Sequence, residues 1–91
     1  MEIKSKFPLG KLRATPKSLF NVNAYDMLVG LRRHASCDWG DICEQDKAAN
    51  ESSFSTQGRL LSEYHDRTGK KFWIITDVDR SATTILLPDE Y

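Results

Sequence analysis

The chain has 91 residues, with 13 basic and 13 acidic side chains and no net charge. A hydrophobic fraction of 40% is enough for a packed core, which excludes a disordered chain, and the length predicts one domain over residues 1–91. No apolar run approaches the roughly 20 residues of a membrane span, and no apolar segment follows the basic N-terminus as in a signal peptide. We therefore expect a cytoplasmic domain without a membrane partner.

The N-terminal half predicts one strand followed by helices. Residues 7–14 favour a strand that Pro8 and Gly10 make irregular. Thr15 followed by Pro16 is typical of a helix N-terminus and predicts a short helical turn to residue 20. Asn23 can cap the first full helix, which we expect to lie on a sheet through side chains at helical spacing: Ala24, Met27, Leu28 and Leu31.

A second full helix is expected over residues 42–53. Asp38-Trp39-Gly40-Asp41 interrupts the chain before it, and Asp41 and Glu44 have the spacing of a capping box. The helix is unusually polar, and the side chains that could face a core are Ile42, Cys43, Ala48 and Ala49. We therefore expect it to be largely exposed and held by contacts beyond its own apolar face.

The C-terminal part predicts three strands, at residues 58–65, 72–76 and 82–87, joined by turns rich in Asp, Gly and Ser. Residues 72–76 are apolar on both faces, which predicts a central strand. The fold class is therefore α+β: a single small domain of order β-α-α-β-β-β, with a C-terminal three-stranded antiparallel meander packed by helices.

Two polar segments are the candidate binding surface. One is the Asp-Trp-Gly-Asp segment with the polar helix behind it, and the other is the turn at residues 77–81. Trp and Arg are common in interfaces, and the arginine fork of Arg80 suits a carboxylate or phosphate; an internal pair with Asp38, Asp41 or Asp46 is the alternative. The candidate residues are Asp38, Trp39, Asp41, Asp46, Asn50, Asp77, Asp79 and Arg80.

No catalytic residue, metal site or cofactor is predicted. His34 and His65 have no local cysteine or serine in a catalytic pattern, and no phosphate-binding or dinucleotide-binding glycine motif is present. Arg59, Tyr64 and His65 could form a ribonuclease-like set. Because Arg59 and His65 share one face of the predicted strand and Tyr64 takes the other, strand parity argues against that set.

Four segments cover nearly the whole chain and carry a resemblance: residues 9–16 (LGKLRATP), 32–50 (RRHASCDWGDICEQDKAAN), 58–64 (GRLLSEY) and 72–91 (FWIITDVDRSATTILLPDEY). They resemble a widespread group of small bacterial proteins of unknown function, mostly carried by plasmids and other mobile elements. Some members are described as a type I restriction subunit. The resemblance implies a mobile-element setting, but no activity and no catalytic residues.

The sequence leads to one functional hypothesis and two alternatives. The hypothesis is a non-enzymatic accessory protein of a mobile element that binds a protein, such as a host defence or nucleic-acid-processing protein. The first alternative is a RelE/ParE-like toxin acting on RNA or the translation machinery, against which the neutral charge argues. The second is a nucleic-acid-binding regulator that uses the basic N-terminal third, where residues 1–33 hold seven Lys/Arg and two acidic residues.

Overall fold

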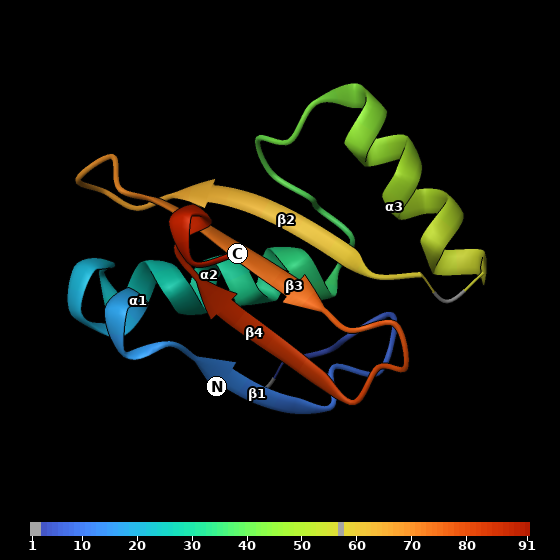
Figure 1. The fold of residues 1–91 in the computed structure, drawn as a ribbon, viewed down its shortest axis with the longest axis horizontal. Helices are drawn as coiled ribbons and strands as arrows, with labels where there is room; N and C mark the ends of the chain where they lie inside the picture. The colour runs from blue at the N-terminus through green and yellow to red at the C-terminus, as the bar shows by residue number, and fades with distance from the viewer. Residues whose placement is uncertain (1–2, 57) are drawn as a thin grey trace.

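A computed structural model describes residues 3–56 and 58–91 of the chain. It is an α+β domain in which one four-stranded sheet packs against helices (Figure 1). The strands are β1 (Lys11–Ala14), β2 (Leu60–His65), β3 (Lys71–Thr76) and β4 (Ala82–Leu86). The helices are α1 (Pro16–Asn21), α2 (Ala24–Ala35) and α3 (Glu44–Thr56), with a final 3-10 turn η1 (Pro88–Glu90).

The predicted element order is partly right. β2, β3 and β4 are antiparallel neighbours, as expected, and β3 is an inner strand. The sheet is nevertheless mixed, because β1 joins the edge of β4 in parallel, and the short turn after Thr15 forms a separate helix. β1 also begins at Lys11 rather than at residue 7. Gly10 before it has a φ of +67°, and a Cβ there would lie 2.3 Å from the carbonyl oxygen of Ser81.

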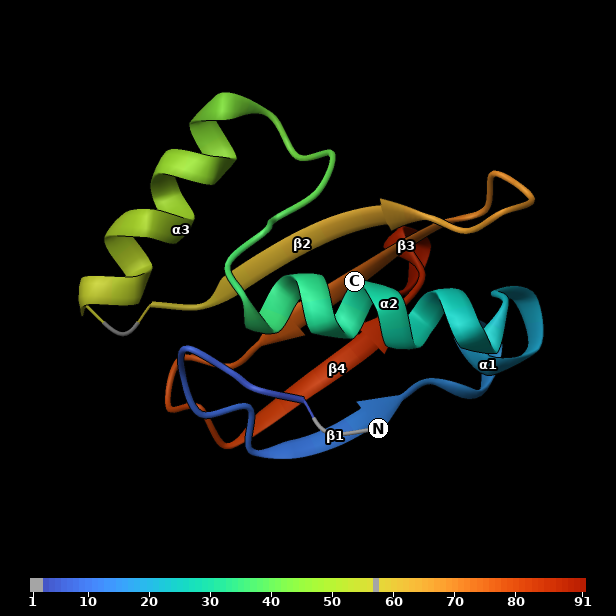
Figure 2. The same cartoon turned by 180° about the vertical axis from the view of Figure 1, so that it is seen from behind.

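α2 covers one face of the sheet (Figure 2). The predicted cap is present, since the Asn23 side chain accepts a hydrogen bond from the backbone N–H of Asp26 at 3.1 Å. Gly30 allows close approach: a Cβ there would lie 3.0 Å from the ring of Phe72. The main core cluster joins α2 to the sheet and contains Val22, Met27, Leu31, Tyr64, Phe72, Ile74, Ile85 and Leu87.

The opposite face of the sheet carries the C-terminal turn η1 (Figure 1). The Tyr91 ring lies 5.8 Å from the ring of Trp73, and the Arg59 guanidinium lies 5.3 Å from the Tyr91 ring centre. No helix of the described residues is both long and apolar enough to cross a bilayer.

α3 lies beyond the edge strand β2 and is largely exposed, as predicted (Figure 1). Its predicted start is wrong, and of the four residues predicted to face a core Ile42 alone is buried. The helix begins at Glu44, so Ile42 is buried in the preceding loop, whereas Cys43, Ala48 and Ala49 are exposed. The predicted apolar side chains therefore do not hold α3 in place, and its aromatic contact with the core is that of Phe54, whose ring lies 6.1 Å from that of Phe7.

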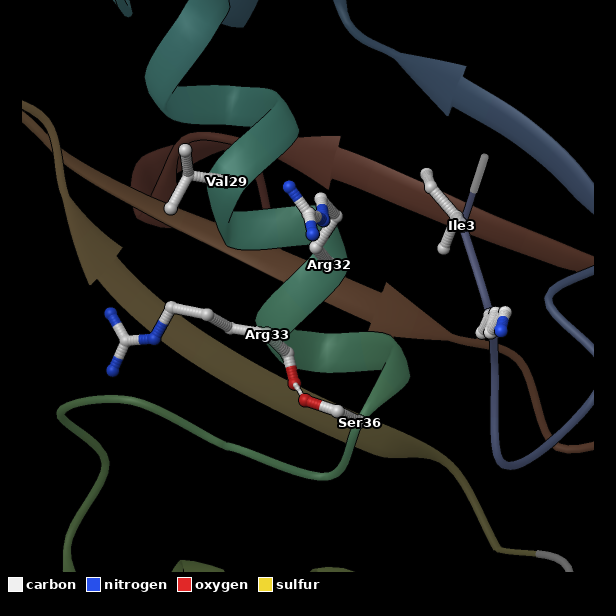
Figure 3. A pocket seen from close by; sticks show the side chains of 6 residues that line it. Ile3, Val29, Arg32, Arg33 and Ser36 are labelled. Carbon is white, nitrogen blue, oxygen red and sulfur yellow. Dashed lines mark hydrogen bonds between the residues drawn. The ribbon is translucent and has the colours of Figure 1, made fainter. Parts of the chain in front are cut away.

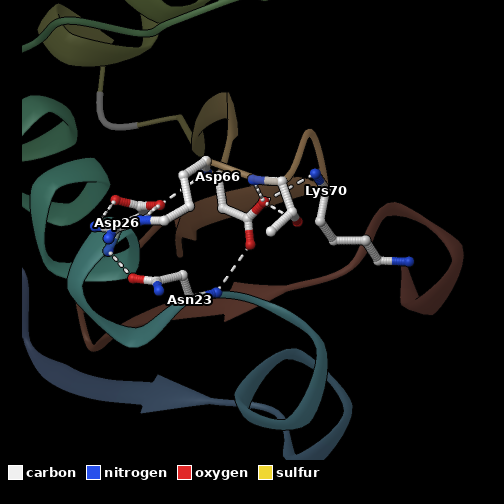
Figure 4. A network of polar contacts seen from close by, with 6 residues as sticks. Asn23, Asp26, Asp66 and Lys70 are labelled. Carbon is white, nitrogen blue, oxygen red and sulfur yellow. Dashed lines mark hydrogen bonds and ion pairs between the residues drawn. The ribbon is translucent and has the colours of Figure 1, made fainter.

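A polar network fixes the N-terminal end of α2 to the turn between β2 and β3 (Figure 4). The carboxylate of buried Asp66 accepts hydrogen bonds from the backbone N–H groups of Asn23, Thr68 and Lys70, each at 2.9 Å. The hydrogen bond that the Thr68 hydroxyl donates to the same carboxylate, together with these backbone bonds, lowers the pKa of Asp66. Asp26 on α2 is in turn paired with Arg67 at 3.0 Å. This network sets the position of α2 over the sheet.

Candidate functional site

Arg80 is bound internally. Its guanidinium donates to the carbonyl oxygens of Gly58 at 2.6 Å and Ser53 at 3.1 Å, and also to that of Asp77 at 3.2 Å. Its backbone has a φ of +61°, which the turn imposes. The predicted internal role is therefore present, but the partners are carbonyl groups near the C-terminal end of α3 rather than Asp38, Asp41 or Asp46. A cation at that end of a helix is also favoured by the helix dipole.

Trp39 is buried, with 4% of its surface exposed. Its ring packs at 5.6 Å from His34 and 6.4 Å from Phe7, and its indole N–H donates to Glu51 on α3 at 3.1 Å. Beside it, Asp38 accepts two hydrogen bonds from Arg33, at 2.8 and 3.2 Å, which lower the pKa of the Asp38 carboxyl. The indole therefore packs in the interior and is not an exposed interface side chain.

Asn50 joins α3 to the edge of the sheet. Its side-chain amide donates to the carbonyl oxygen of Leu61 at 2.6 Å and accepts from the N–H of Leu61 at 3.1 Å. β2 is an edge strand, and these two backbone groups of Leu61 lie on its open side, away from β3. Asn50 on α3 thus satisfies two backbone groups at the open edge of β2, and these hydrogen bonds help to hold the helix against the domain.

We expect Asn50→Ala to cost about 2 kcal/mol of folding free energy, because it leaves two partly buried backbone groups of Leu61 without partners. Hydrogen exchange should also become faster in α3. The matched control is Gln45→Ala, which removes an exposed polar side chain from the same helix and should change stability by less than about 0.5 kcal/mol. Equal stability of the two variants in urea unfolding would contradict this role.

The remaining candidate residues lie at the surface. Asp41 contacts His65 Nδ1 at 3.0 Å, and Asp46 is exposed in the first turn of α3. Asp79 accepts from the N–H of Ser81 at 3.0 Å, and the Asp77 carbonyl accepts from the N–H of Arg80 at 2.9 Å. Asp77 and Asp79 thus form a turn with Arg80. Trp39 and Arg80 both lie against the Phe7 ring, at 6.4 and 6.0 Å, but Trp39 is buried there. The structure does not bring the two predicted segments together as one exposed surface.

A buried chain of polar side chains runs through the core. His34 Nδ1 lies 2.6 Å from Ser62 Oγ, and His34 Nε2 lies 2.9 Å from Thr76 Oγ1. Thr76 Oγ1 is 2.8 Å from Thr83 Oγ1, which donates to the Leu9 carbonyl at 2.7 Å. Because Thr83 donates its one hydroxyl proton to the Leu9 carbonyl, Thr76 donates to Thr83 and accepts from His34 Nε2. In the neutral ring, Nδ1 then accepts the hydroxyl proton of Ser62.

This serine–histidine contact joins residues 28 positions apart, which is why the sequence did not reveal it. Both side chains are 0% exposed, so no substrate reaches them. Burial lowers the pKa of His34 to about 3, which matches a neutral structural histidine. The ribonuclease-like set is also split, because Tyr64 is buried on the α2 side while His65 is exposed beside Asp41. Nor do the described residues include a cluster suited to a metal ion.

The side of α2 that faces away from the sheet is also apolar, which the sequence analysis missed. Tyr25, Leu28 and Val29 are 60%, 43% and 37% exposed. Residues three and four apart lie on one side of a helix, so these three side chains form one patch, called here the outer row of α2. α1 adjoins the N-terminal end of α2 (Figure 2), and its Leu19 and Phe20 are also exposed, at 61% and 91%.

A depression of about 490 Å³ lies between the C-terminal half of α2 and the N-terminal segment (Figure 3). Ile3 lines it from that segment and Val29 from α2. Its other lining side chains are Lys4, Arg32, Arg33 and Ser36. Of these, the Arg33 guanidinium is paired with Asp38 at 2.8 Å.

A second depression, of about 270 Å³, lies on the other side of α2, against the end of β2. Val29 and Arg33 line both depressions and therefore form a ridge between them. The second lining mixes charges, with Asp26 paired to Arg67, and the Arg67 guanidinium also lies 5.7 Å from the Tyr25 ring centre. The ion pair of Asp26 with Arg67 thus lies beside Tyr25, at one edge of the outer row.

A clue to this surface was available in the sequence. Leu28 was assigned to the buried face, yet with Tyr25 and Val29 it extends the apolar surface of α2 beyond the side that packs on the sheet. A helix of that kind is usually covered on more than one side. Comparison with protein-family models, curated proteins and solved structures finds no match.

Proposed function

We propose that the chain is a non-enzymatic, cytoplasmic accessory protein of a mobile genetic element that binds another protein through the outer row of α2. The observation that carries the binding role is the apolar side of α2 that faces away from the sheet. The mobile-element setting, and a host defence or nucleic-acid-processing protein as the partner, rest on the family resemblance alone.

Exposed apolar side chains are ordinary when they are scattered, but grouped ones mark interaction sites. Tyr25, Leu28 and Val29 are grouped by helical spacing, and α2 itself is held rigidly by its core contacts and by Asp66. A rigid helix face loses little conformational entropy on binding, which favours affinity. Trp39 and Arg80 already donate hydrogen bonds within the domain, to Glu51 and to the Gly58 carbonyl. α2 is therefore a better candidate for the binding surface than either residue.

The two alternatives have less support. A ribonuclease needs a base, an acid and a phosphate-binding cation on one accessible surface, whereas Tyr64 is buried and His65 lies elsewhere. A nucleic-acid-binding regulator needs concentrated positive charge. Lys17 and Arg33 are instead paired with Asp89 and Asp38, at 2.8 Å each, which neutralises part of the basic N-terminal third.

Val29→Glu should abolish partner binding while leaving the fold intact. The substitution places a charge in the centre of the outer row, and glutamate is at least as good a helix former as valine, so α2 should remain stable. We expect a loss of affinity of at least about 2 kcal/mol, which is the magnitude of an interface hot spot. The measurement is copurification of the tagged protein with one defined partner from cells that produce it, beside thermal unfolding of each variant.

The matched control is Val78→Glu, the same change at a valine that is 59% exposed in the turn between β3 and β4. It should bind the partner as the unmodified chain does. Two results would overturn the assignment: loss of the partner with Val78→Glu and not with Val29→Glu, or retention of the partner by both variants.

A further inference from the structure

We infer that the open edge of β1 binds an extended, acidic segment of a partner protein by strand addition, at a surface separate from the outer row of α2. The two edges of the sheet differ. Along β2, Asn50 binds both backbone groups of Leu61, and the chain around Gly40 pairs with Glu63. β1 forms the other edge, and in the described part of the chain β4 is its one neighbouring strand (Figure 1).

The backbone groups of Leu12 and Ala14 point outward from this edge. Lys11 and Thr15 donate their N–H groups to carbonyl oxygens on the β4 side, at 2.9 and 3.0 Å. Successive residues direct their N–H and C=O groups to opposite sides of a strand, so Leu12 and Ala14 direct both groups away from β4. No hydrogen bond among the described residues occupies these groups. They are therefore donors and acceptors to which an added strand can bond.

Exposed cations flank Leu12 along the strand. Lys11 and Arg13 are both exposed, and neither pairs with an acidic side chain of the residues that the structure describes. Ala14 packs against the core cluster under α2, so Leu12, which is 52% exposed, lies on the α2 face and the two cations lie on the η1 face. An added strand that alternates acidic and apolar side chains would place carboxylates opposite Lys11 and Arg13 and an apolar side chain opposite Leu12.

A second copy of this chain fits the edge less well. When β1 pairs antiparallel with itself about a twofold axis through Leu12, Lys11 lies opposite Arg13 of the copy. When the axis passes through Arg13, the two Arg13 side chains lie opposite each other. Like charges directly opposite each other destabilise a strand pair, so the cations that favour an acidic segment also oppose self-pairing of β1.

The test uses labelled peptides in which valine alternates with glutamate or with lysine. Fluorescence anisotropy should give an affinity for the glutamate peptide about tenfold above that for the lysine peptide, because ion pairs opposite Lys11 and Arg13 are replaced by repulsion. The preference should decrease as the salt concentration rises. Equal binding of the two peptides, stronger binding of the lysine peptide, or no binding of either would overturn the inference.

Methylation of the peptide backbone separates strand addition from attraction between charges alone. In the added strand the valine amides face β1, because the valines lie opposite Leu12 and Ala14, whereas the glutamate amides face solvent. N-methyl groups on the valine amides should therefore lower the affinity about tenfold or more, and N-methyl groups on the glutamate amides should leave it nearly unchanged. Equal effects of the two modifications would contradict pairing with the β1 edge.

Variants of the protein locate the contact. Leu12→Pro removes an N–H group that makes no hydrogen bond within the described chain, so the fold should persist in thermal unfolding while the glutamate peptide is no longer bound. Lys11→Glu with Arg13→Glu should invert the charge preference, whereas Lys70→Glu, at an exposed cation in the β2–β3 turn, should leave it unchanged. A folded Leu12→Pro variant that binds the peptide normally would exclude the β1 edge as the site.

Hydrogen exchange gives a direct readout of the edge. The amide protons of Leu12 and Ala14 should exchange rapidly in the free protein and become protected by the glutamate peptide, and protection elsewhere instead would overturn the inference. Val29→Glu should bind this peptide as the unmodified chain does, so the β1 edge and the outer row of α2 can fail separately. Binding of an oligothymidylate that depends on Lys11 and Arg13, without binding of the glutamate peptide, would identify a nucleic acid as the occupant and overturn the inference.

Discussion

Gly40→Ala should strongly destabilise this domain. Gly40 has a φ of +74°, and a Cβ at this position would lie 2.1 Å from the carbonyl oxygen of Glu63 and 2.7 Å from the Tyr64 ring. To avoid this contact the chain would have to move away from β2. That movement would weaken two backbone hydrogen bonds: the Asp41 N–H donates to the Glu63 carbonyl at 2.8 Å, and the Glu63 N–H donates to the Trp39 carbonyl at 3.1 Å. Backbone strain, overpacking and lost hydrogen bonds together should cost about 4 kcal/mol.

A loss of this size is a large part of the stability of a 91-residue domain, and it should lower Tm by more than about 15 °C. The control is Gly69→Ala, since Gly69 has a φ of +87° but no atom within 4 Å of its Cβ position. It isolates backbone strain and should cost about 1 kcal/mol. If the two variants unfold at the same urea concentration, steric contact with β2 is not what Gly40 avoids.

Acid should destabilise the protein through His34. The pKa of His34 is lowered by burial from 6.5 to about 3, so between these values the unfolded chain binds a proton that the folded protein does not. Stability from this group is therefore complete above about pH 6.5 and is lost as the pH falls, by about 1.4 kcal/mol per pH unit. Urea unfolding between about pH 4.5 and 6.5 avoids most of the titration of the carboxyl groups.

His34→Gln should be less stable than the unmodified protein at neutral pH and should lack this slope. Glutamine can donate and accept hydrogen bonds but does not titrate, so the difference between the two proteins should narrow as the pH falls. His65→Gln removes the other histidine, which is exposed, and should keep the slope. A slope that persists in His34→Gln would assign the acid sensitivity to another group.

Local signals predicted most of the elements. Thr15 and Asn23 cap helices as their side-chain chemistry suggests, and the alternation in β2 places Ser62 and Tyr64 in the core. The parallel pairing of β1 with β4 was not predicted, because it joins residues about 70 positions apart and depends on no local pattern. The packing of α3 was also missed, since it depends on Asn50 and the backbone of Leu61 rather than on apolar periodicity.

The candidate site was harder to predict than the fold. Trp39 and Arg80 were predicted to bind a partner because such side chains are common in interfaces. In the structure, Trp39 donates a hydrogen bond to Glu51 and Arg80 to the Ser53 carbonyl. The sequence alone does not distinguish an internal role from a role in an interface. The apolar residues of α2 were read as one buried stripe, although only Met27 and Leu31 of the four assigned to it are buried. The exposure of Leu28 and Val29 became evident only once the sheet was placed on one side of the helix.

The most direct test of the central claim is photo-crosslinking in cells, with a photoreactive amino acid at Leu28 and, separately, at Val78. Leu28 lies in the outer row of α2, and Val78 is an exposed apolar residue in the β3–β4 turn. The account predicts one discrete adduct from position 28 that is lost when Val29→Glu is added, and none from position 78. An adduct from position 78 with none from position 28 would contradict the claim that the chain binds its partner through α2.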